Sequence, residues 1–309
     1  MTPVLVFGAG GQIGRELIDQ RWPDGLRVVG ADRASADIAD RAAVGHAFAR
    51  MRPGLVVNAA AYTAVDKAEQ ESARAFAVNR DGAAHLAEAC AAQSVPLIHL
   101  STDYVFDGAK PGPYVEDDPV APLGVYGASK EAGEAAIRTR CARHVILRTA
   151  WVFGAHGNNF VKTMLRLGAE RPALGIVADQ RGCPTEAADI ARTIARIAGA
   201  LLAPPGAPND PALLGTFHYV GAPATTWHGF AEAIFRRLAA RGRKVPTLSA
   251  ITTADYPTPA RRPANSVLAT DKLARVYGIA PCDWPAALDR VLDALIDAPR
   301  AAAGTGPER

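Results

Sequence analysis

A run of glycines between an apolar segment and a helical segment constrains this chain more than any other feature. Val4–Phe7 reads as a β-strand, Gln12–Gln20 reads as an α-helix, and Gly8, Gly11 and Gly14 lie in or just after the turn that joins them. Glycine at this spacing lets the backbone turn sharply and lets an anionic group approach without a Cβ in the way. The start of the following helix offers unpaired N–H groups and the positive end of the helix dipole. A strand, a glycine turn and a helix in this order predict dinucleotide binding.

Strand-like and helical segments continue to alternate through the first half of the chain. Short apolar strands separated by helices are typical of βαβ units, in which helices cover both faces of a parallel sheet. We therefore expect an α/β fold with a doubly wound parallel sheet, forming an NAD(P)-binding Rossmann domain over residues 1–150. The expected strands are Val4–Phe7, Arg27–Ala31, Leu55–Ala59, Pro96–Ser101 and His144–Thr149, and the expected helices are Gln12–Gln20, Arg41–Arg52, Ala73–Gln93 and Ser129–Arg140.

The alternation becomes less regular after residue 150, which predicts a smaller, mostly helical substrate-binding lobe over residues 151–300. Parts of 185–222 are expected to complete the first domain. The proline-rich segment Ala203–Pro211 is expected to be a loop, and residues 301–309 a disordered tail. The expected helices are Phe160–Leu167, Ala188–Leu202, Trp227–Ala240, Asp271–Tyr277 and Trp284–Ile296, with strands at Gly175–Ala178 and Phe217–Val220.

Composition narrows the class of protein. The 309 residues are 49% hydrophobic and 21% charged, as in ordinary globular proteins. The net charge of +3 comes from 34 basic and 31 acidic residues that are mixed along the chain, so no basic stripe predicts a nucleic-acid partner. No apolar stretch reaches the roughly 20 residues of a membrane span, and the first one leads straight into the glycine turn, unlike a signal peptide. The four cysteines lack metal-ligand spacing, so we expect free thiols in a cytoplasmic protein with no membrane partner.

The choice of cofactor depends on the end of the second expected strand. Asp32 lies there, 18 residues after Gly14. A carboxylate at this place can accept hydrogen bonds from the adenosine ribose, which favours NAD. Arg33 beside it can instead meet the 2′-phosphate of NADP, and Asp32 can also simply cap a turn. The residues therefore leave NADPH and NADH both open.

Tyr126 and Lys130 are four residues apart, which places both on one face of a helix. A nearby lysine ammonium stabilises a phenolate, so the tyrosine can donate a proton to a carbonyl oxygen as hydride arrives at the carbon. Thr102 follows a strand at the edge where open α/β sheets bind ligands, and its hydroxyl can hydrogen-bond the same oxygen. The alternative to a catalytic role is that Tyr126 and Lys130 are simply an exposed pair on a helix and that Thr102 is an ordinary strand residue.

Nearly the whole chain, roughly residues 3–297, resembles the extended short-chain dehydrogenase/reductase family. Its most similar members reduce the C4 ketone of dTDP-4-dehydro-L-rhamnose to dTDP-L-rhamnose with NADPH or NADH. A nucleotide-sugar 4-epimerase, another ketosugar reductase and a non-catalytic NADP-binding regulatory subunit are the alternatives. The resemblance is carried by GAGGQIG (8–14), NAAAYTAVDKAE (58–69), STDYVFDG (101–108), YGASK (126–130), RTAWVFG and GNNFV (148–161), DQRGCPT (179–185) and RRPANSVL (261–268).

The resemblance also implies roles for individual residues. Tyr126 would be the proton donor, Lys130 would orient the nicotinamide ribose and lower the tyrosine pKa, and Thr102 would bind the ketone oxygen. The residues expected to contact the nucleotide sugar are Thr102, Asp103 and Trp151, the last of which can otherwise be plain core. The expected cofactor-binding residues are Gly8, Gly11, Gln12, Ile13, Gly14, Asp32, Asp37, Ile38, Ala59, Ala60, Ala61, Tyr126 and Lys130.

Some relatives form a dimer bridged by magnesium through acidic residues. Glu16 matches one of these positions, but Glu186 and Asp189 do not fall clearly in register with the others. We therefore expect no required metal, and either a monomer or a homodimer.

Overall fold

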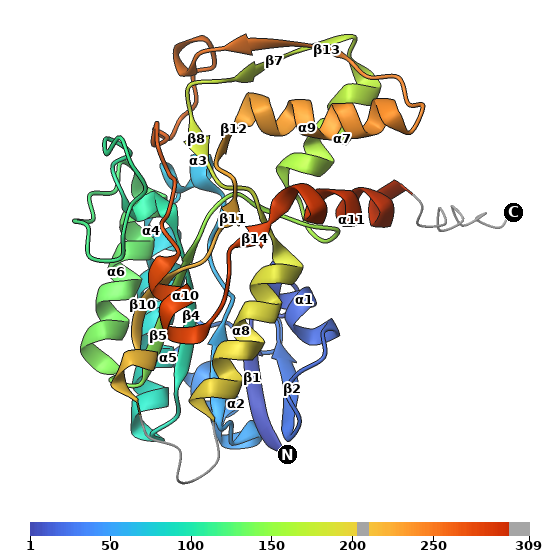
Figure 1. The fold of residues 1–309 in the computed structure, drawn as a ribbon. Coiled ribbons are helices and arrows are strands. Elements are labelled where there is room, and N and C mark those ends of the chain that lie inside the picture. The colour runs from blue at the N-terminus through green and yellow to red at the C-terminus, as the bar shows by residue number, and fades with distance from the viewer. Residues whose placement is uncertain (203–209, 297–309) are drawn as a thin grey trace, which may run out of the picture.

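Six parallel strands form the central sheet of the protein, in the order β2-β1-β3-β4-β5-β10 (Figure 1). The computed structural model describes residues 1–202 and 210–296. The predicted doubly wound α/β fold is confirmed, because helices follow the strands and cover both faces of the sheet. The strands are β1 (Thr2–Phe7), β2 (Leu26–Ala31), β3 (Leu55–Asn58), β4 (Leu97–Thr102), β5 (His144–Thr149) and β10 (Gly215–His218).

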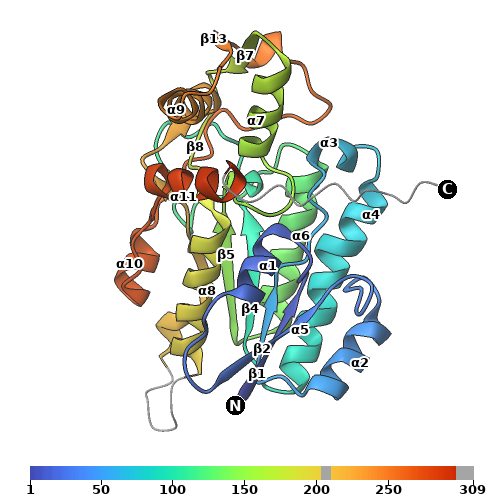
Figure 2. The same ribbon diagram turned by 90° about the vertical axis from the view of Figure 1, so that its right-hand side faces the viewer.

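Alternate residues of the strands supply the cores on the two faces of the sheet, as a period of two requires. Leu5 and Phe7 pack with Phe48 in one hydrophobic cluster, whereas Val4 and Val6 belong to the other. Helices α2, α5 and α6 cover the first face, and α1 and α8 cover the second (Figure 2). Their bounds are α1 (Gln12–Asp19), α2 (Arg41–Met51), α5 (Gly82–Ala92), α6 (Val125–Arg140) and α8 (Ala187–Leu201).

Two predicted helices differ from the structure in ways that affect the site. The helix expected over Ala73–Gln93 consists of α4 (Ser72–Phe76), a π-helical turn (Ala77–Asp81) and α5. The helix expected from Ser129 begins at Val125, where the Glu69 carboxylate accepts a hydrogen bond from the Val125 N–H at 2.9 Å. This earlier start places both Tyr126 and Lys130 inside α6.

The other lobe lies beyond the carboxyl ends of the sheet strands (Figure 1). Its larger elements are α7 (Phe160–Glu170), α9 (Trp227–Ala240), α11 (Trp284–Ile296) and the parallel pair β7 (Ala173–Val177) and β13 (Thr247–Ile251). Short pairs join β6 (Val152–Phe153) to β9 (Thr185–Glu186), β8 (Arg181–Gly182) to β12 (Thr225–Thr226), and β11 (Gly221–Ala222) to β14 (Cys282–Asp283).

The chain returns to the sheet after entering this lobe. α10 (Asp271–Tyr277) packs beside β10 and α8, so segments from the second half of the chain help to build the Rossmann layers. The expected strand Phe217–Val220 is β10, which begins and ends two residues earlier. Residues 203–209 of the expected loop and the expected tail 301–309 lie outside the described residues. In the part of the chain that the structure describes, no helix is both long and apolar enough to cross a membrane.

Candidate active site

A cleft of about 500 Å³ opens at the carboxyl ends of β1 and β3. The strand order reverses at this place, because the chain goes from β1 to β2 on one side and then to β3 on the other. Such a switch point is where open α/β sheets bind their ligands. The cleft brings together eight of the residues expected to bind the cofactor, namely Gly8, Gly11, Asp32, Asp37, Ile38, Ala59, Ala60 and Ala61.

Glycine is required in the turn that forms the floor of this cleft. Gly8 has φ +80°, and a Cβ there would lie 2.5 Å from the backbone nitrogen of Ala60. A Cβ on Gly14 would lie 2.0 Å from the carbonyl oxygen of Gly8. α1 begins at Gln12, and none of the described side chains caps its first N–H groups. The bare backbone and the free helix start fit the pyrophosphate of a dinucleotide.

The end of the cleft beside β2 carries the two charged side chains on which the expected choice of cofactor depends, Asp32 and Arg33. The Asp32 carboxylate accepts hydrogen bonds from the Ser35 N–H at 2.9 Å and from the Ser35 hydroxyl at 2.7 Å, which lower its pKa. Arg33 also lines the cleft, with its Nε 3.3 Å from the Asp37 carboxylate. Asp32 therefore caps a turn in this structure, while a guanidinium stands beside it.

Gln12 and Ile13 lie at the start of α1. The amide of Gln12 points toward the other lobe, where its Oε1 accepts a hydrogen bond from Asn159 at 2.7 Å. Asn159 also caps α7 by accepting from the Lys162 N–H at 3.2 Å. One side chain therefore links the glycine turn to a helix of the second lobe.

Lys130 is 2% exposed, and its Nζ donates to the carbonyl oxygen of Leu100 at 2.7 Å. The same Nζ lies 3.2 Å from Nε2 of His99. Burial lowers the pKa of Lys130 to about 8, and Glu134 opposes this effect.

Tyr126 stands one turn earlier on α6, with its ring 5.5 Å from that of Tyr104. Burial raises the pKa of Tyr126 to about 12, although a hydrogen bond with Thr102 acts in the opposite direction. The expected lowering of the tyrosine pKa by Lys130 stays a prediction. Nζ of Lys130 is held by Leu100 and His99, and burial dominates at the phenol. The tyrosine is therefore a neutral phenol near pH 7 and carries a proton to donate.

Thr102 ends β4 beside this phenol. Its hydroxyl donates to Oδ1 of Asp103 at 2.9 Å and accepts from the Tyr104 N–H at 3.2 Å. Burial raises the pKa of Asp103 to about 6. Among the described residues, Oδ2 of Asp103 and the hydroxyl of Thr149, both buried, find no hydrogen-bond partner. Thr149 pairs with Thr102 across the sheet, so two unpaired polar atoms lie at the edge where a polar ligand is expected.

Trp151 stands in the second lobe rather than in the central core. Its backbone has φ +47°, and its ring stacks on Trp227 at 3.5 Å between centroids. A Cβ on Gly182 would lie 2.3 Å from the Trp151 ring, which explains the glycine in DQRGCPT. Trp227 and Phe160 line a second cavity of about 390 Å³, together with Arg171 and Arg262.

Three polar residues near the site were absent from the predicted set. His99 and Asn58 are each 1% exposed and lie 2.9 Å apart, through Nδ1 and Nδ2. Asn79, in the π-helical turn, accepts from the Tyr62 N–H at 2.8 Å and donates to the Ser129 hydroxyl at 2.9 Å. A histidine inside the apolar strand LIHLST is a signal that the sequence offers.

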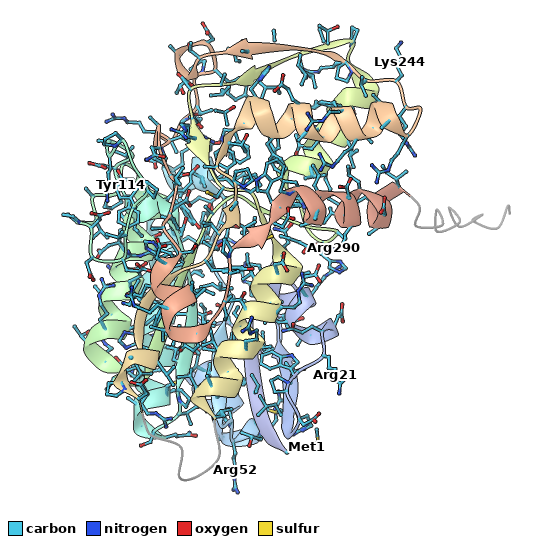
Figure 3. The ribbon with its side chains drawn as sticks, viewed as in Figure 1. Met1, Arg21, Arg52, Tyr114, Lys244 and Arg290 are labelled. Carbon is cyan, nitrogen blue, oxygen red and sulfur yellow. The ribbon has the colours of Figure 1, made fainter. Side chains whose placement is uncertain are left out.

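The acidic residues considered for a metal are paired with arginines or a histidine. Arg290 extends from α11 (Figure 3), and its Nη2 lies 2.6 Å from the Glu186 carboxylate. Asp189 is paired with Arg192, and Glu16 lies 3.9 Å from His156. Within residues 1–202 and 210–296, no three His, Cys, Asp or Glu side chains gather as metal ligands. The absence of a required metal stays a prediction.

Comparison with known families matches residues 1–296 to the family described as RmlD substrate binding domain. A dTDP-4-dehydrorhamnose reductase from Sinorhizobium fredii is 47% identical over 296 residues, covering 95% of this chain and 97% of the relative. The chain belongs to this reductase family. It is an oxidoreductase that uses a nicotinamide cofactor, as expected from the glycine turn and the Tyr126–Lys130 pair.

Solved structures of the family share the whole fold. The dTDP-4-dehydrorhamnose reductase from Clostridium acetobutylicum has a TM-score of 0.87 and 35% identity, covering 95% of this chain and 99% of its own. The Bacillus anthracis reductase, solved in complex with NADP, has a TM-score of 0.85 and 34% identity, covering 94% of this chain and 99% of its own.

Proposed function

We propose that this protein reduces the C4 ketone of dTDP-4-dehydro-L-rhamnose to dTDP-L-rhamnose, with NADPH as the hydride donor and Tyr126 as the proton donor. The observation that carries the proposal is that Thr102, at the end of β4, hydrogen-bonds Tyr126, which stands one turn before the buried Lys130 on α6. Family membership supports the substrate, since the relatives named above are dTDP-4-dehydrorhamnose reductases.

The preference for NADPH is argued from the adenosine end of the cleft. The Asp32 carboxylate is engaged by Ser35, so it is poorly placed to take both ribose hydroxyls as NAD requires. Arg33 is beside it and 73% exposed along its side chain, so its guanidinium can exchange the contact with Asp37 for a 2′-phosphate. The Bacillus anthracis relative, solved with NADP, points the same way.

The reaction adds a hydride to C4 and a proton to its oxygen. When bound, the nicotinamide supplies the hydride. Tyr126 then gives its phenolic proton to the ketone oxygen, and the Thr102 hydroxyl hydrogen-bonds that oxygen as charge develops on it. Lys130 orients the nicotinamide ribose and stabilises the phenolate that remains, which solvent reprotonates. The backbone at Gly8 and Gly11 and the start of α1, which Gly14 lets pack closely on the turn, would hold the pyrophosphate.

The lobe over residues 151–300 is proposed to bind the nucleotide sugar. Its 390 Å³ cavity combines aromatic rings with the guanidinium groups of Arg171 and Arg262. Aromatic faces stack on a base, and guanidinium groups pair with a diphosphate, so the lining suits a nucleoside diphosphate. Trp151 and Asp103 would contact the sugar between this cavity and the glycine cleft.

The direct test offers the purified protein dTDP-4-dehydro-L-rhamnose and NADPH and follows the loss of NADPH absorbance. We expect one NADPH consumed for each dTDP-L-rhamnose formed, and a lower kcat/KM with NADH. Tightly bound NAD in the purified protein, with turnover that needs no added cofactor, would instead indicate a 4-epimerase. A monomer and a homodimer both remain compatible with the proposal.

A further inference from the structure

A buried histidine lies behind the Tyr126–Lys130 pair, and the reaction proposed above does not use it. His99 is the third residue of β4, between the apolar neighbours Ile98 and Leu100. Both of its ring nitrogens have partners: Nδ1 is 2.9 Å from Nδ2 of Asn58, and Nε2 is 3.2 Å from Nζ of Lys130. A chain of contacts therefore runs from the lysine, through the imidazole, to the asparagine at the end of β3.

The backbone at the far end of this chain fixes which atoms donate. The Ala60 N–H can only donate, and Oδ1 of Asn58 accepts it at 3.0 Å. Asn58 must then present its NH₂ group to His99, so Nδ1 of His99 must accept. A neutral imidazole that accepts through Nδ1 carries its proton on Nε2, which faces Lys130.

This arrangement discriminates between the two charge states of the lysine. An ammonium has three donors and no acceptor, so an Nε2–H group can only meet Lys130 as a free amine. When Lys130 is an ammonium, it needs the lone pair of Nε2, and the imidazole proton must sit on Nδ1. That tautomer directs a donor at the NH₂ group of Asn58, so the contact is lost or the amide must turn against the Ala60 N–H.

The other charged groups around this chain are already paired. Glu134 faces Lys130 from the next turn of α6, and its carboxylate is held by Arg148 at 2.7 Å and Arg138 at 2.9 Å. His144 faces His99 from β5, with its own Nδ1 bound to the carbonyl oxygen of Cys141 at 2.6 Å. Burial holds the pKa of His99 well below its ordinary value, so the ring is neutral and only its tautomer can change.

We propose that His99 is a positioning residue that sets the charge of Lys130 through its own tautomer, with Asn58 biasing the ring toward the Nε2–H form. This inference rests on the proposed function in that it gives the lysine charge a role in reduction. In the Nδ1–H form Lys130 is the ammonium that supports the Tyr126 phenolate. In the Nε2–H form it is an amine that does not.

The tautomer can be observed without turnover, by long-range ¹H–¹⁵N correlation NMR on the ¹⁵N-labelled full chain. The His99 signals are identified by their loss in His99→Gln. We expect Nδ1–H at low pH and Nε2–H at high pH, with the change centred on the Lys130 pKa of about 8. A wild-type His99 ring that keeps one tautomer between about pH 6 and pH 10 overturns the proposal; His99→Gln serves only to assign the signals.

Asn58→Asp should reverse the preference of the His99 ring for the Nε2–H form. In Asn58→Asp the carboxylate accepts from both the Ala60 N–H and an Nδ1–H group, so the ring should stay in the Nδ1–H form over the same range. We expect the alkaline limb of the kcat profile to move upward by about one pH unit, a tenfold effect above that limb. His144→Gln, which replaces a second buried histidine that does not touch Lys130, should move neither the tautomer nor the limb.

The outcomes separate this inference from the proposed function. A tautomer change centred on the Lys130 pKa in a protein that does not reduce dTDP-4-dehydro-L-rhamnose supports the network and removes the proposed substrate. The opposite outcome is a protein that reduces dTDP-4-dehydro-L-rhamnose at full rate while its Asn58→Asp variant keeps the wild-type tautomer and the wild-type alkaline limb. That result supports the proposed function and contradicts the role of His99.

Discussion

Two buried carboxylates near the site differ in charge because their partners differ. Glu134 faces the guanidinium groups of Arg148 and Arg138, and these hold its pKa below the ordinary value despite burial. Asp103 has hydroxyl partners instead, so burial prevails and raises its pKa to about 6. An ion pair can offset desolvation, whereas neutral hydrogen bonds offset only part of it. The residue that stands beside Thr102 is therefore the one that changes charge near neutral pH.

This difference predicts how stability depends on pH. Because the folded-state pKa of Asp103 is raised above its ordinary 3.8 to about 6, the protein loses stability as the pH rises through that window. Asp103→Asn removes the loss. We compare the unfolding free energy of the variant with that of wild type at pH 4 and at pH 7. We expect this difference to shift in favour of the variant by up to ~3 kcal/mol from the lower to the higher pH. Denaturant unfolding at both pH values measures the difference, and an offset that is the same at both would contradict it.

Tyr126→Phe isolates the proton donor. The variant keeps the ring and its packing against Tyr104 but lacks the phenolic proton. We expect kcat to fall by about 10²–10⁴-fold, the usual contribution of general acid catalysis, while the variant still binds NADPH. Steady-state kinetics and NADPH fluorescence titration test both parts. A variant that reduces the ketone at a near-normal rate would remove Tyr126 from the mechanism.

At the scale of elements, the start of α1 combines close contacts that no larger residue could make. Gly8 lies against Ala60, Gly14 lies against Gly8, and none of the described side chains caps the first N–H groups of the helix. Gly10 belongs to the same turn, but a Cβ there would meet only the Cβ of Asp32, at an ordinary contact distance of 3.9 Å. Close packing therefore requires glycine at Gly8 and Gly14 but not at Gly10.

Gly14→Ala and Gly10→Ala form a matched pair on this turn. The first would place a methyl group 2.0 Å from the Gly8 oxygen, so the turn or α1 must shift; we expect a loss of roughly 2–4 kcal/mol and of NADPH binding. The second should stay within about 0.5 kcal/mol of wild type. Thermal unfolding and NADPH titration measure both. Equal stability of the two variants would show that the contact at Gly14 does not constrain the fold.

The sequence predicts the sheet well because its signals are local. The period of apolar residues places β1 to β5 within one or two residues, and the glycine turn follows β1 as expected. The start of α6 depends on Glu69, which is 56 positions away, and the π-helical turn depends on Asn79 bonding to Tyr62 and Ser129. Contacts between distant segments have no periodic signature. For the same reason the sequence shows that Lys130, His99 and Asn58 are present but does not predict that their side chains contact one another.

At the scale of the whole molecule, side chains tie the two lobes together around the site. Asn159 bonds Gln12 beside the glycine turn, and Arg262 pairs with Asp66 through two hydrogen bonds, of 3.1 Å and 2.8 Å. Asp66 lies in α3 (Val65–Ala68), which packs against α6 of the cofactor-binding lobe, whereas Arg262 lines the 390 Å³ cavity of the second lobe. A guanidinium proposed to meet the substrate diphosphate is thus oriented from the cofactor-binding lobe.

Asp66→Asn tests whether this connection serves substrate binding. The change keeps the size of the side chain and removes the charge that orients Arg262. Because the pair is partly exposed, with side chains 22% and 41% accessible, we expect a cost of about 1 kcal/mol. That corresponds to about a fivefold rise in KM for the nucleotide sugar, with kcat and NADPH affinity unchanged.

Glu170→Gln is the control for that substitution, because it breaks the exposed pair between Arg166 and Glu170 within α7 and touches no described residue of the other lobe. Its KM should equal that of wild type. If Asp66→Asn weakens NADPH binding as much as it raises KM, the pair acts on the cofactor lobe and Arg262 is not oriented toward substrate. If only KM rises, and if added salt raises the wild-type KM more than that of the variant, the ion pair between the lobes is what positions the guanidinium, since salt screens such a partly exposed pair.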